Sequence, residues 1–198
     1  MTLKKASLSA TSVLALATGA AKRKRGATSN ARAGASFQDL IRAATDTPDY
    51  CWMIGQPVAK VVGSGQKRIV VYTAKNGVDF VGVAHGKPVA IEAKRLPGAA
   101  SLSGAKNEST RAEARFLSAF CRARGFAGYL VYDPDVSGPD LVAHIYVVCR
   151  RDDFDRIEAG APVALRDRAG VPRVERFAVP VGGEISAIRR AIAWTVQP

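Results

Sequence analysis

Two acidic side chains are spaced so that a β-hairpin would bring them face to face. Asp79 and Glu92 lie in the apolar stretches 77–84 and 87–94, which are separated only by His85-Gly86. A two-residue loop is the shortest common hairpin connection, and the positive φ angles of its turns suit Gly and are tolerated by His. A hairpin closed there places Asp79 directly opposite Glu92, where two carboxylates repel each other unless a cation lies between them. The spacing therefore predicts a divalent-metal site with hard oxygen ligands suited to Mg²⁺, or to Mn²⁺ as a substitute.

Lys94 belongs to the same predicted group. Side chains alternate along a strand, so Lys94 shares the face of Glu92, and Gly77 lies opposite Lys94 and leaves space for a substrate. A charged E-A-K at the end of an apolar strand departs from simple apolar patterning, which is typical of functional sites. The alternative is that Glu92 and Lys94 are ordinary charges on a solvent-facing strand. The other face of the hairpin is predicted to enter the core through Val78, Phe80, Val89, Ile91 and Ala93.

A family resemblance is carried by the run G-V-D-F-V-G-V-A-H-G-K-P-V-A-I-E-A-K. It resembles the core of the PD-(D/E)XK nucleases, and most closely that of the RecU-type Holliday junction resolvases. That family has an Asp in a short strand, a glycine-containing turn, and an apolar strand ending in E-A-K. The resemblance covers about 34–132 and implies an α/β fold: a restriction-endonuclease-like mixed β-sheet flanked by helices, with a β-hairpin stalk.

The resemblance also implies roles for individual residues. Asp79 and Glu92 would bind Mg²⁺, with the main-chain carbonyl of Ala93 as a further ligand. Lys94 would orient the attacking water or stabilise charge on the phosphate. The activity implied is Mg²⁺-dependent endonucleolytic cleavage that resolves Holliday junctions and other branched DNA in recombination and repair.

The first predicted helix departs from the family pattern. The family usually has a glutamate there that adds a metal contact, whereas this chain has Gln38, followed by Asp39. Gln38 stands at the motif position and is the favoured metal contact, although its amide brings no charge. Asp39 has an alternative role in a capping interaction with Ser36. On the later helix, where the family often has a Gln, no residue of 110–113 is assigned.

Branched DNA and a second copy of the chain are the implied partners, because a four-way junction is two-fold symmetric and suits a C₂ homodimer. The implied location is the cytoplasm of a bacterial or phage-infected cell. Two other functions remain open. One is a different PD-(D/E)XK nuclease of the repair or restriction type. The other is a catalytically weak branched-DNA-binding module that lost its metal through the change at Gln38.

The charge of the chain favours a polyanionic partner. Lys and Arg number 29 against 17 Asp and Glu, for a net charge of +12. Residues 1–38 contain no acid and seven basic residues. We predict that 1–33 form a disordered basic arm and that 34–198 form the nuclease domain; an organellar transit peptide is the alternative for the arm. The arm is predicted to bind phosphates through Lys22, Arg23, Lys24 and Arg25.

Two further basic groups are predicted to contact DNA. Lys67 and Arg68 follow the glycine-rich turn 63–66 at the tip of a predicted hairpin, where they would probe the centre of a junction. Arg111 and Arg115 lie on one stripe of a predicted helix, well placed for backbone phosphates. The alternative for that stripe, which also includes Ser118 and Arg122, is a solvated helix face.

The elements that must position these residues are predicted from periodicity, capping and turn signals. A helix capped by Ser36 ends before Thr47-Pro48. A second helix, capped by Ser109, buries Ala112, Phe116, Ala119, Phe120 and Ala123. Further helices are predicted at 152–159 and 184–194, and a flexible stretch at 97–107. Strands are predicted at 57–62, 68–73, 77–84, 88–94, 126–132 and 141–148, with another hairpin within 164–179. This order predicts a mixed α/β sheet with a helix on each side.

The cysteines and the hydropathy exclude several classes of protein. Three cysteines without C-x-x-C spacing, Cys51, Cys121 and Cys149, exclude a disulfide scaffold and a cysteine zinc cage, and are interpreted as buried thiols of a reducing compartment. No apolar stretch approaches the roughly 18 to 20 residues needed to cross a bilayer, so no membrane partner is expected.

Overall fold

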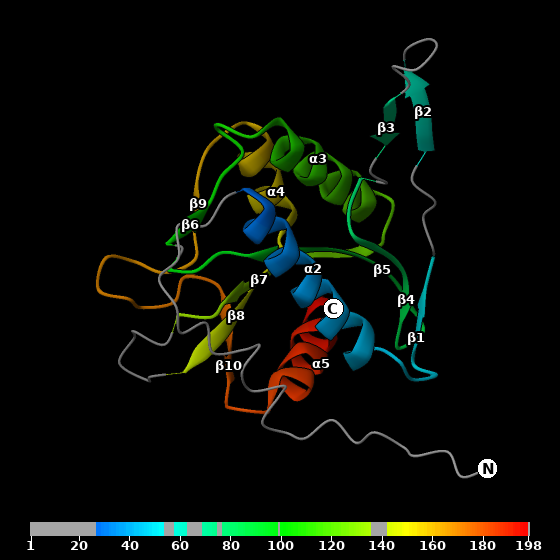
Figure 1. The fold of residues 1–198 in the computed structure, drawn as a ribbon. Coiled ribbons are helices and arrows are strands. Elements are labelled where there is room, and N and C mark those ends of the chain that lie inside the picture. The colour runs from blue at the N-terminus through cyan, green and yellow to red at the C-terminus, as the bar shows by residue number, and fades with distance from the viewer. Residues whose placement is uncertain are drawn as a thin grey trace, which may run out of the picture. The chain divides into compact units, whose positions relative to one another are not determined.

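The computed structural model describes residues 27–53, 58–62, 69–74, 77–98, 100–135 and 142–197. Contacts divide the chain into two units, Met1–Ala31 and Arg32–Pro198, and the fold below concerns the second unit together with the start of its first helix. The elements, labelled as in Figure 1, are α2 (Ala27–Ala44), β1 (Tyr50–Trp52), β2 (Val58–Val62), β3 (Ile69–Ala74), β4 (Phe80–Ala84), β5 (Lys87–Arg95), β6 (Ser101–Leu102), α3 (Glu108–Arg122), β7 (Phe126–Asp133), β8 (Ala143–Val148), α4 (Arg151–Glu158), β9 (Val163–Ala164), β10 (Glu175–Val179) and α5 (Glu184–Thr195).

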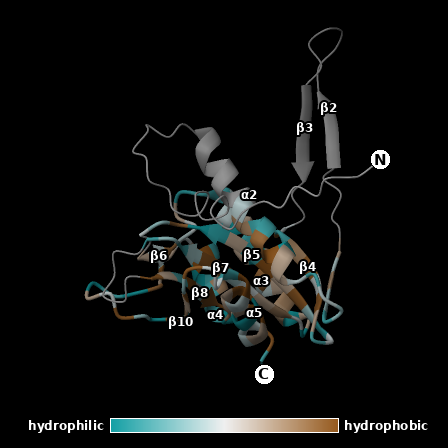
Figure 2. Cartoon of the chain, turned by 60° about the horizontal axis from the view of Figure 1, so that its bottom comes forward, coloured by the Kyte–Doolittle hydropathy of each residue, from teal (hydrophilic) through white to brown (hydrophobic). Residues whose placement is uncertain are grey.

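A six-stranded mixed sheet organises the fold, in the order β1-β4-β5-β7-β8-β10. Strands β5 and β7 pair in parallel, and the other neighbours pair antiparallel. Helices α2 and α5 pack on one face around Ile41 and Ile188, while α3 and α4 pack on the other around Leu117 and Phe154. The hydrophobic ribbons, brown in Figure 2, gather in the central strands and the helices packed on them. The predicted mixed α/β sheet flanked by helices is therefore confirmed.

The hairpin that carries the acidic pair forms in the predicted register. Ala84 pairs with Lys87, and Phe80 pairs with Ile91. His85 and Gly86 have φ angles of 50° and 75°, the positive values that a two-residue primed turn requires.

Helix α2 begins earlier than predicted. It starts at Ala27, so Ser36 lies inside the helix and does not cap it. Residues 27–33, predicted to belong to the disordered arm, are helical. Alanine and arginine have high helix propensity, and four alanines and Arg32 continue the helix through the weaker helix formers Thr28, Ser29, Asn30 and Gly34. Residues 1–26 lie outside the described residues. The helix ends at Ala44, before the Thr-Pro dipeptide as predicted.

Helix α3 is capped and rotated differently from the prediction. Asn107 is the N-cap, and its side-chain oxygen accepts a hydrogen bond from the Thr110 N–H; Ser109 instead donates to Glu113. The predicted buried face is wrong. Ala112, Ala119 and Ala123 are exposed, and Phe116 and Phe120 are only partly buried because they reach the core from the side of the helix. The buried residues are Thr110, Glu113, Ala114, Leu117 and Ser118.

Two short strands alter the predicted topology. The stretch 97–107, predicted to be flexible, contains β6, which pairs with β9. Since β9 is bonded to β6, and β10 is bonded to β8, the hairpin predicted within 164–179 does not form as a pair of strands. The chain does turn back within this segment, through an isolated bridge between Arg166 and Pro172.

The other predicted elements are confirmed within a few residues. β2 and β3 form a separate antiparallel pair, β7 and β8 are buried strands of the main sheet, and α4 and α5 are helices. No helix in the described ranges has the length and apolarity needed to cross a membrane. The cysteines are free thiols; Cys51 is exposed, against the expectation of burial, because it lies in the edge strand β1.

Candidate active site

The two predicted metal ligands lie together at the open end of the β4–β5 hairpin. Asp79 immediately precedes β4, and its N–H donates to Glu92 Oε2 at 3.1 Å. In return, the Ala93 N–H donates to Asp79 Oδ2 at 3.0 Å. Glu92 is only 3% exposed, so it is not an ordinary charge on a solvent-facing strand. The carboxylates are thus tied across the hairpin by reciprocal hydrogen bonds to main-chain N–H groups.

Lys94 lies on the face of Glu92, as strand alternation predicts, and contacts two carboxylates. Its Nζ is 2.7 Å from Glu92 Oε1 and 2.6 Å from Glu113 Oε2. Glu113 projects from α3, is 2% exposed, and accepts a hydrogen bond from Ser109 Oγ at 2.9 Å. Lys94 therefore bridges acids from β5 and α3, and its position is set from both sides.

Glu113 is a site residue that was not predicted from the sequence. The sequence does contain an indication of its role. If Ala114 and Leu117 form the buried face of the helix, Glu113 is a charged residue on that buried face. A buried carboxylate requires a charged or hydrogen-bonding partner, so its position predicts a cation nearby. The signal is hidden because the phenylalanines of α3 suggest a different buried face.

The environment shifts the protonation of the cluster. Burial, followed by the nearby Asp79 carboxylate, raises the pKa of Glu92 to about 8 against the opposing effect of Lys94. Burial lowers the pKa of Lys94, but Glu92 and Glu113 outweigh it, so the net shift is upward. Burial also raises the pKa of Tyr129, which pairs with Glu92 across β5–β7 and donates to the Thr110 carbonyl. Lys94 therefore stays a cation, and Glu92 holds a proton near neutral pH unless another cation approaches.

A divalent cation fits the cluster in charge and in donor type. Asp79, Glu92 and Glu113, when ionised with Lys94, leave a formal charge of −2. Carboxylate oxygens and the Ala93 carbonyl are hard donors of the kind Mg²⁺ prefers, and Mg²⁺ is usually held by one or two carboxylates while keeping several waters. In the part of the chain that the structure describes, no three His, Cys, Asp or Glu residues form a group that could hold a metal ion. Asp79 and Glu92 would therefore hold the cation together with water and substrate oxygens.

The two hairpin residues expected around this site are placed differently from the prediction. Gly77 does not leave space for a substrate, because a Cβ there would lie 2.3 Å from the ring of Phe116. Its φ of 35° and this close ring account for the glycine. Val78 and Phe80 were predicted to share one face of the hairpin, but they lie on opposite faces of the sheet. Val78 packs with Leu117 on the α3 side, and Phe80 packs on the α2 side. The reason is that β4, with its regular alternation of side chains, begins only at Phe80.

The two candidates on α2 differ in their surroundings. Gln38 is partly buried. The Asp39 side chain is 70% exposed and accepts a hydrogen bond from Arg42 Nη1 at 2.8 Å, so it neither caps the helix with Ser36 nor lies in a buried cluster. The ion pair with Arg42 argues against Asp39 as the acid that replaces the family's glutamate.

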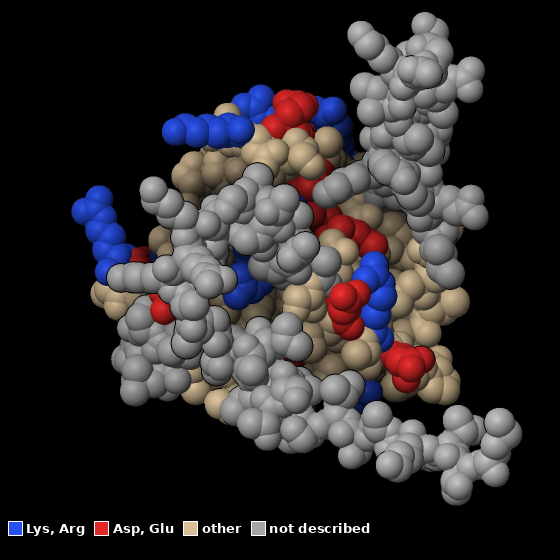
Figure 3. Space-filling view, viewed as in Figure 1, with Lys and Arg blue, Asp and Glu red and all other residues tan. Residues whose placement is uncertain are grey.

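The predicted basic stripe on α3 is engaged in protein contacts. Arg111 donates to the carbonyls of Gly104 and Ala105 at 2.8 and 3.0 Å. Arg115 pairs with Glu158 of α4 at 2.7 Å, and further along Arg122 pairs with another acid of that helix. Figure 3 shows acidic and basic side chains intermixed over α3. Arg115 and Arg122 thus contribute to the contact between α3 and α4, and Arg111 binds the segment before α3. DNA binding by these arginines would compete with the contacts within the protein.

The remaining predicted DNA-binding residues, Lys22, Arg23, Lys24, Arg25, Lys67 and Arg68, lie outside the described residues.

Comparison with models of protein families finds none that matches the chain, and comparison with curated proteins finds no match either. The function is therefore inferred from the residues and their geometry.

Proposed function

We propose that the chain is a metal-dependent DNA endonuclease of the PD-(D/E)XK type with a restriction-endonuclease-like fold. The observation that carries this proposal is the hydrogen-bonded group formed by Asp79, the buried Glu92 and Lys94 at the end of one hairpin. Two acids held against mutual repulsion, with a lysine ammonium beside them, favour binding of a divalent cation and of a phosphodiester.

Each residue has a distinct task in this proposal. Asp79 and Glu92 hold the metal, which lowers the pKa of a bound water and offsets charge on the phosphate. Lys94 presents a compact positive charge to the attacking water or to a phosphate oxygen. Glu113 keeps Lys94 protonated and holds its Nζ in place from the side of α3.

The proposed substrate is branched DNA, cleaved by a homodimer that places one site on each of two strands of a four-way junction. The net charge of +12 supports a nucleic-acid partner. The separate β2–β3 pair is proposed as the stalk that enters the junction.

The direct test is cleavage of a synthetic four-way junction and of a linear duplex of the same sequence, with Mg²⁺ and with EDTA. Symmetric nicking of the junction alone, dependent on Mg²⁺, supports a resolvase. Equal cleavage of both substrates supports a repair or restriction-type nuclease. Junction binding without cleavage in either Mg²⁺ or Mn²⁺ contradicts the enzymatic proposal.

Gln38→Glu is expected to lower the Mg²⁺ concentration needed for half-maximal cleavage, because it adds an anionic ligand where the family motif has its glutamate. Asp39→Ala is the matched control: an exposed ion pair contributes at most about 1 kcal/mol, and its loss should leave the metal requirement unchanged. Titration of cleavage against Mg²⁺ for both variants checks this. Loss of activity in Asp39→Ala with a silent Gln38→Glu would transfer the role to Asp39.

Deletion of residues 1–26 is expected to weaken DNA binding and to reduce its salt dependence, because it removes six of the seven basic residues of 1–38 and keeps only Arg32. Ending the deletion before Ala27 leaves α2 whole. For each basic residue that binds a phosphate and is removed, the log–log salt slope should fall by about 0.9. The slope is measured by fluorescence anisotropy from low to high salt, with thermal unfolding as the folding control. An unchanged slope would favour a targeting role for the segment.

A further inference from the structure

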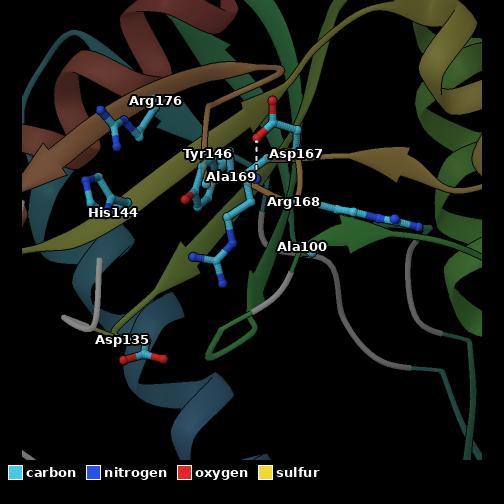
Figure 4. A pocket seen from close by; sticks show the side chains of 10 residues that line it. Ala100, Asp135, His144, Tyr146, Asp167, Arg168, Ala169 and Arg176 are labelled. Atoms are coloured by element: carbon cyan, nitrogen blue, oxygen red, sulfur yellow. Dashed lines mark hydrogen bonds between the residues drawn. The ribbon is translucent and has the colours of Figure 1, made fainter. Parts of the chain in front are cut away.

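A polar cavity lies beside β8 and β10, away from the acidic cluster. Its volume is about 430 Å³, within the range of cavities that hold small ligands. The charged and polar groups that line it are Arg166, Arg168, Arg176, His144, Tyr146, Asp135 and Asp167. Figure 4 shows His144 and Tyr146 on β8 near Arg176 of β10, with Asp135 across the cavity and Arg168 extending to one side.

The charge balance of this cavity favours an anion. Among the described residues, three arginines line it against two aspartates, Asp135 and Asp167. Asp167 is engaged within its own turn, where Oδ1 accepts from the N–H groups of Ala169 and Val171 at 2.9 Å. Its Oδ2 also accepts from Arg173 at 3.1 Å, a fourth arginine outside the lining. Asp133 adds a third carboxylate near Tyr146, so with Arg173 included four arginines face three carboxylates around the cavity, a net formal charge of +1.

Two of the three arginines, Arg166 and Arg176, are positioned by the fold. Arg176 and Tyr146 are paired residues of β10 and β8 and therefore share a face of the sheet. Arg166 donates to the Gly98 carbonyl at 2.8 Å, which ties it to the segment that follows β5. Burial raises the pKa of Tyr146; Arg166 and Arg176 act to lower it and Asp133 acts to raise it, so both guanidinium groups and this carboxylate lie within electrostatic reach of the phenol. Little ordering is then needed when a ligand binds.

We propose that this cavity binds a phosphoryl group. Guanidinium groups present forked N–H donors that match phosphate oxygens, and they stay charged when partly buried. The Tyr146 hydroxyl and the His144 imidazole line the same cavity and are hydrogen-bonding groups of the kind that contact phosphate oxygens.

The register of the sheet connects this cavity with the acidic cluster. Lys94 pairs with Val131, Val131 pairs with Tyr146, and Tyr146 pairs with Arg176, so all four lie in one row across β5, β7, β8 and β10. Three interstrand steps of about 4.8 Å place Arg176 about 14 Å from Lys94 along this row. Two sources of the phosphoryl group are distinguished by experiment: a backbone phosphate of bound DNA, an assignment that depends on the proposed nuclease function, and a phosphate monoester.

The experiment measures stabilisation of the full chain by inorganic phosphate at constant ionic strength, through thermal unfolding and isothermal titration calorimetry. Wild type is expected to be stabilised, and Arg176→Gln and Arg166→Gln are expected to bind phosphate at least tenfold more weakly. Arg122→Gln, which removes the same charge on α3, is the control and should bind as wild type does. Arg176→Lys, which keeps the charge, should retain part of the affinity and guards against misfolding of the glutamine variant.

Two additional ligands distinguish the sources, both measured in the Asp79→Asn background so that no cleavage occurs. Arg176-dependent binding of a thymidine dinucleotide identifies a phosphodiester as the ligand. Binding of thymidine monophosphate without binding of the dinucleotide identifies a monoester. The second result keeps the cavity as a phosphate site even if the chain cleaves no DNA. Absence of binding by all three ligands, or equal binding by wild type and Arg176→Gln, would overturn the proposal.

Discussion

Replacing Asp79 by Asn, or Glu92 by Gln, is expected to lower the rate of junction cleavage by at least about 10³-fold. A bound metal contributes several kcal/mol to stabilising the transition state, and about 1.4 kcal/mol corresponds to each factor of ten in rate. Both substitutions keep the size of the side chain, so the hairpin and the DNA-binding surface should persist. Junction binding is expected to survive and to tighten, because repulsion between carboxylate and phosphate is relieved.

The measurement pairs single-turnover cleavage with a gel-shift assay on the same four-way junction. Glu108→Gln is the matched control, since it removes one acid from an exposed position of α3, where the side chain is 77% exposed. Its cleavage rate should equal that of wild type. Cleavage by Asp79→Asn or Glu92→Gln at near the wild-type rate in Mg²⁺ would show that the acidic pair is not the metal site.

The stability of the metal-free protein is expected to fall as the pH rises from about 5 to about 8, and Glu92 is the reason. The pKa of Glu92 is about 8 in the folded chain, against 4.5 for an ordinary glutamate. Between these values the folded state holds a proton that the unfolded state has lost, so rising pH favours unfolding. The slope contributed by Glu92 is at most about 1.4 kcal/mol per pH unit, and it disappears above the folded-state pKa.

Urea unfolding in EDTA at a series of pH values measures this slope. Glu92→Gln should flatten it between pH 5 and pH 8 and give a more stable protein than wild type above pH 8. Lys94→Met should lower the free energy of unfolding, because it leaves Glu92 and Glu113 buried without their shared cation. Mg²⁺ at pH 8.5 should raise the unfolding temperature of wild type and not that of Glu92→Gln. The same slope in wild type and Glu92→Gln would show that Glu92 titrates normally.

The part of the site that sequence could predict is the part fixed by local chain geometry. A two-residue loop occupied by His85-Gly86 determines the register of β4 and β5, and that register alone brings Asp79 to Glu92. Strand alternation then places Lys94 without any knowledge of the rest of the fold. These steps concern only residues close together in the chain.

The part that sequence could not predict depends on contacts between distant segments. Glu113 joins the site because α3 turns its Thr110–Leu117 face toward the sheet, and the rotation of an amphipathic helix with aromatic residues on its flank is decided by packing. Similarly, the pairing of Arg115 with Glu158 could not be predicted, because α4 lies far along the chain from α3. The two-residue strands β6 and β9 are too short for any periodic pattern to show, so their pairing could not be predicted either.

The parallel pairing of β5 with β7 through α3 has an evolutionary consequence. Because the chain leaves β5, crosses through α3 and returns beside it, every charged residue of the acidic cluster comes from the contiguous stretch 79–113. The charged residues that line the cavity proposed to bind phosphate come from 135–176. Two separate blocks of coding sequence thus specify the two sites, and mutation or recombination can alter one block while the other is inherited intact. Under the two proposals, a lineage that loses one acid of the cluster would lose cleavage and keep phosphate binding. A lineage that replaces Arg176 would keep cleavage and change the ligand of the cavity.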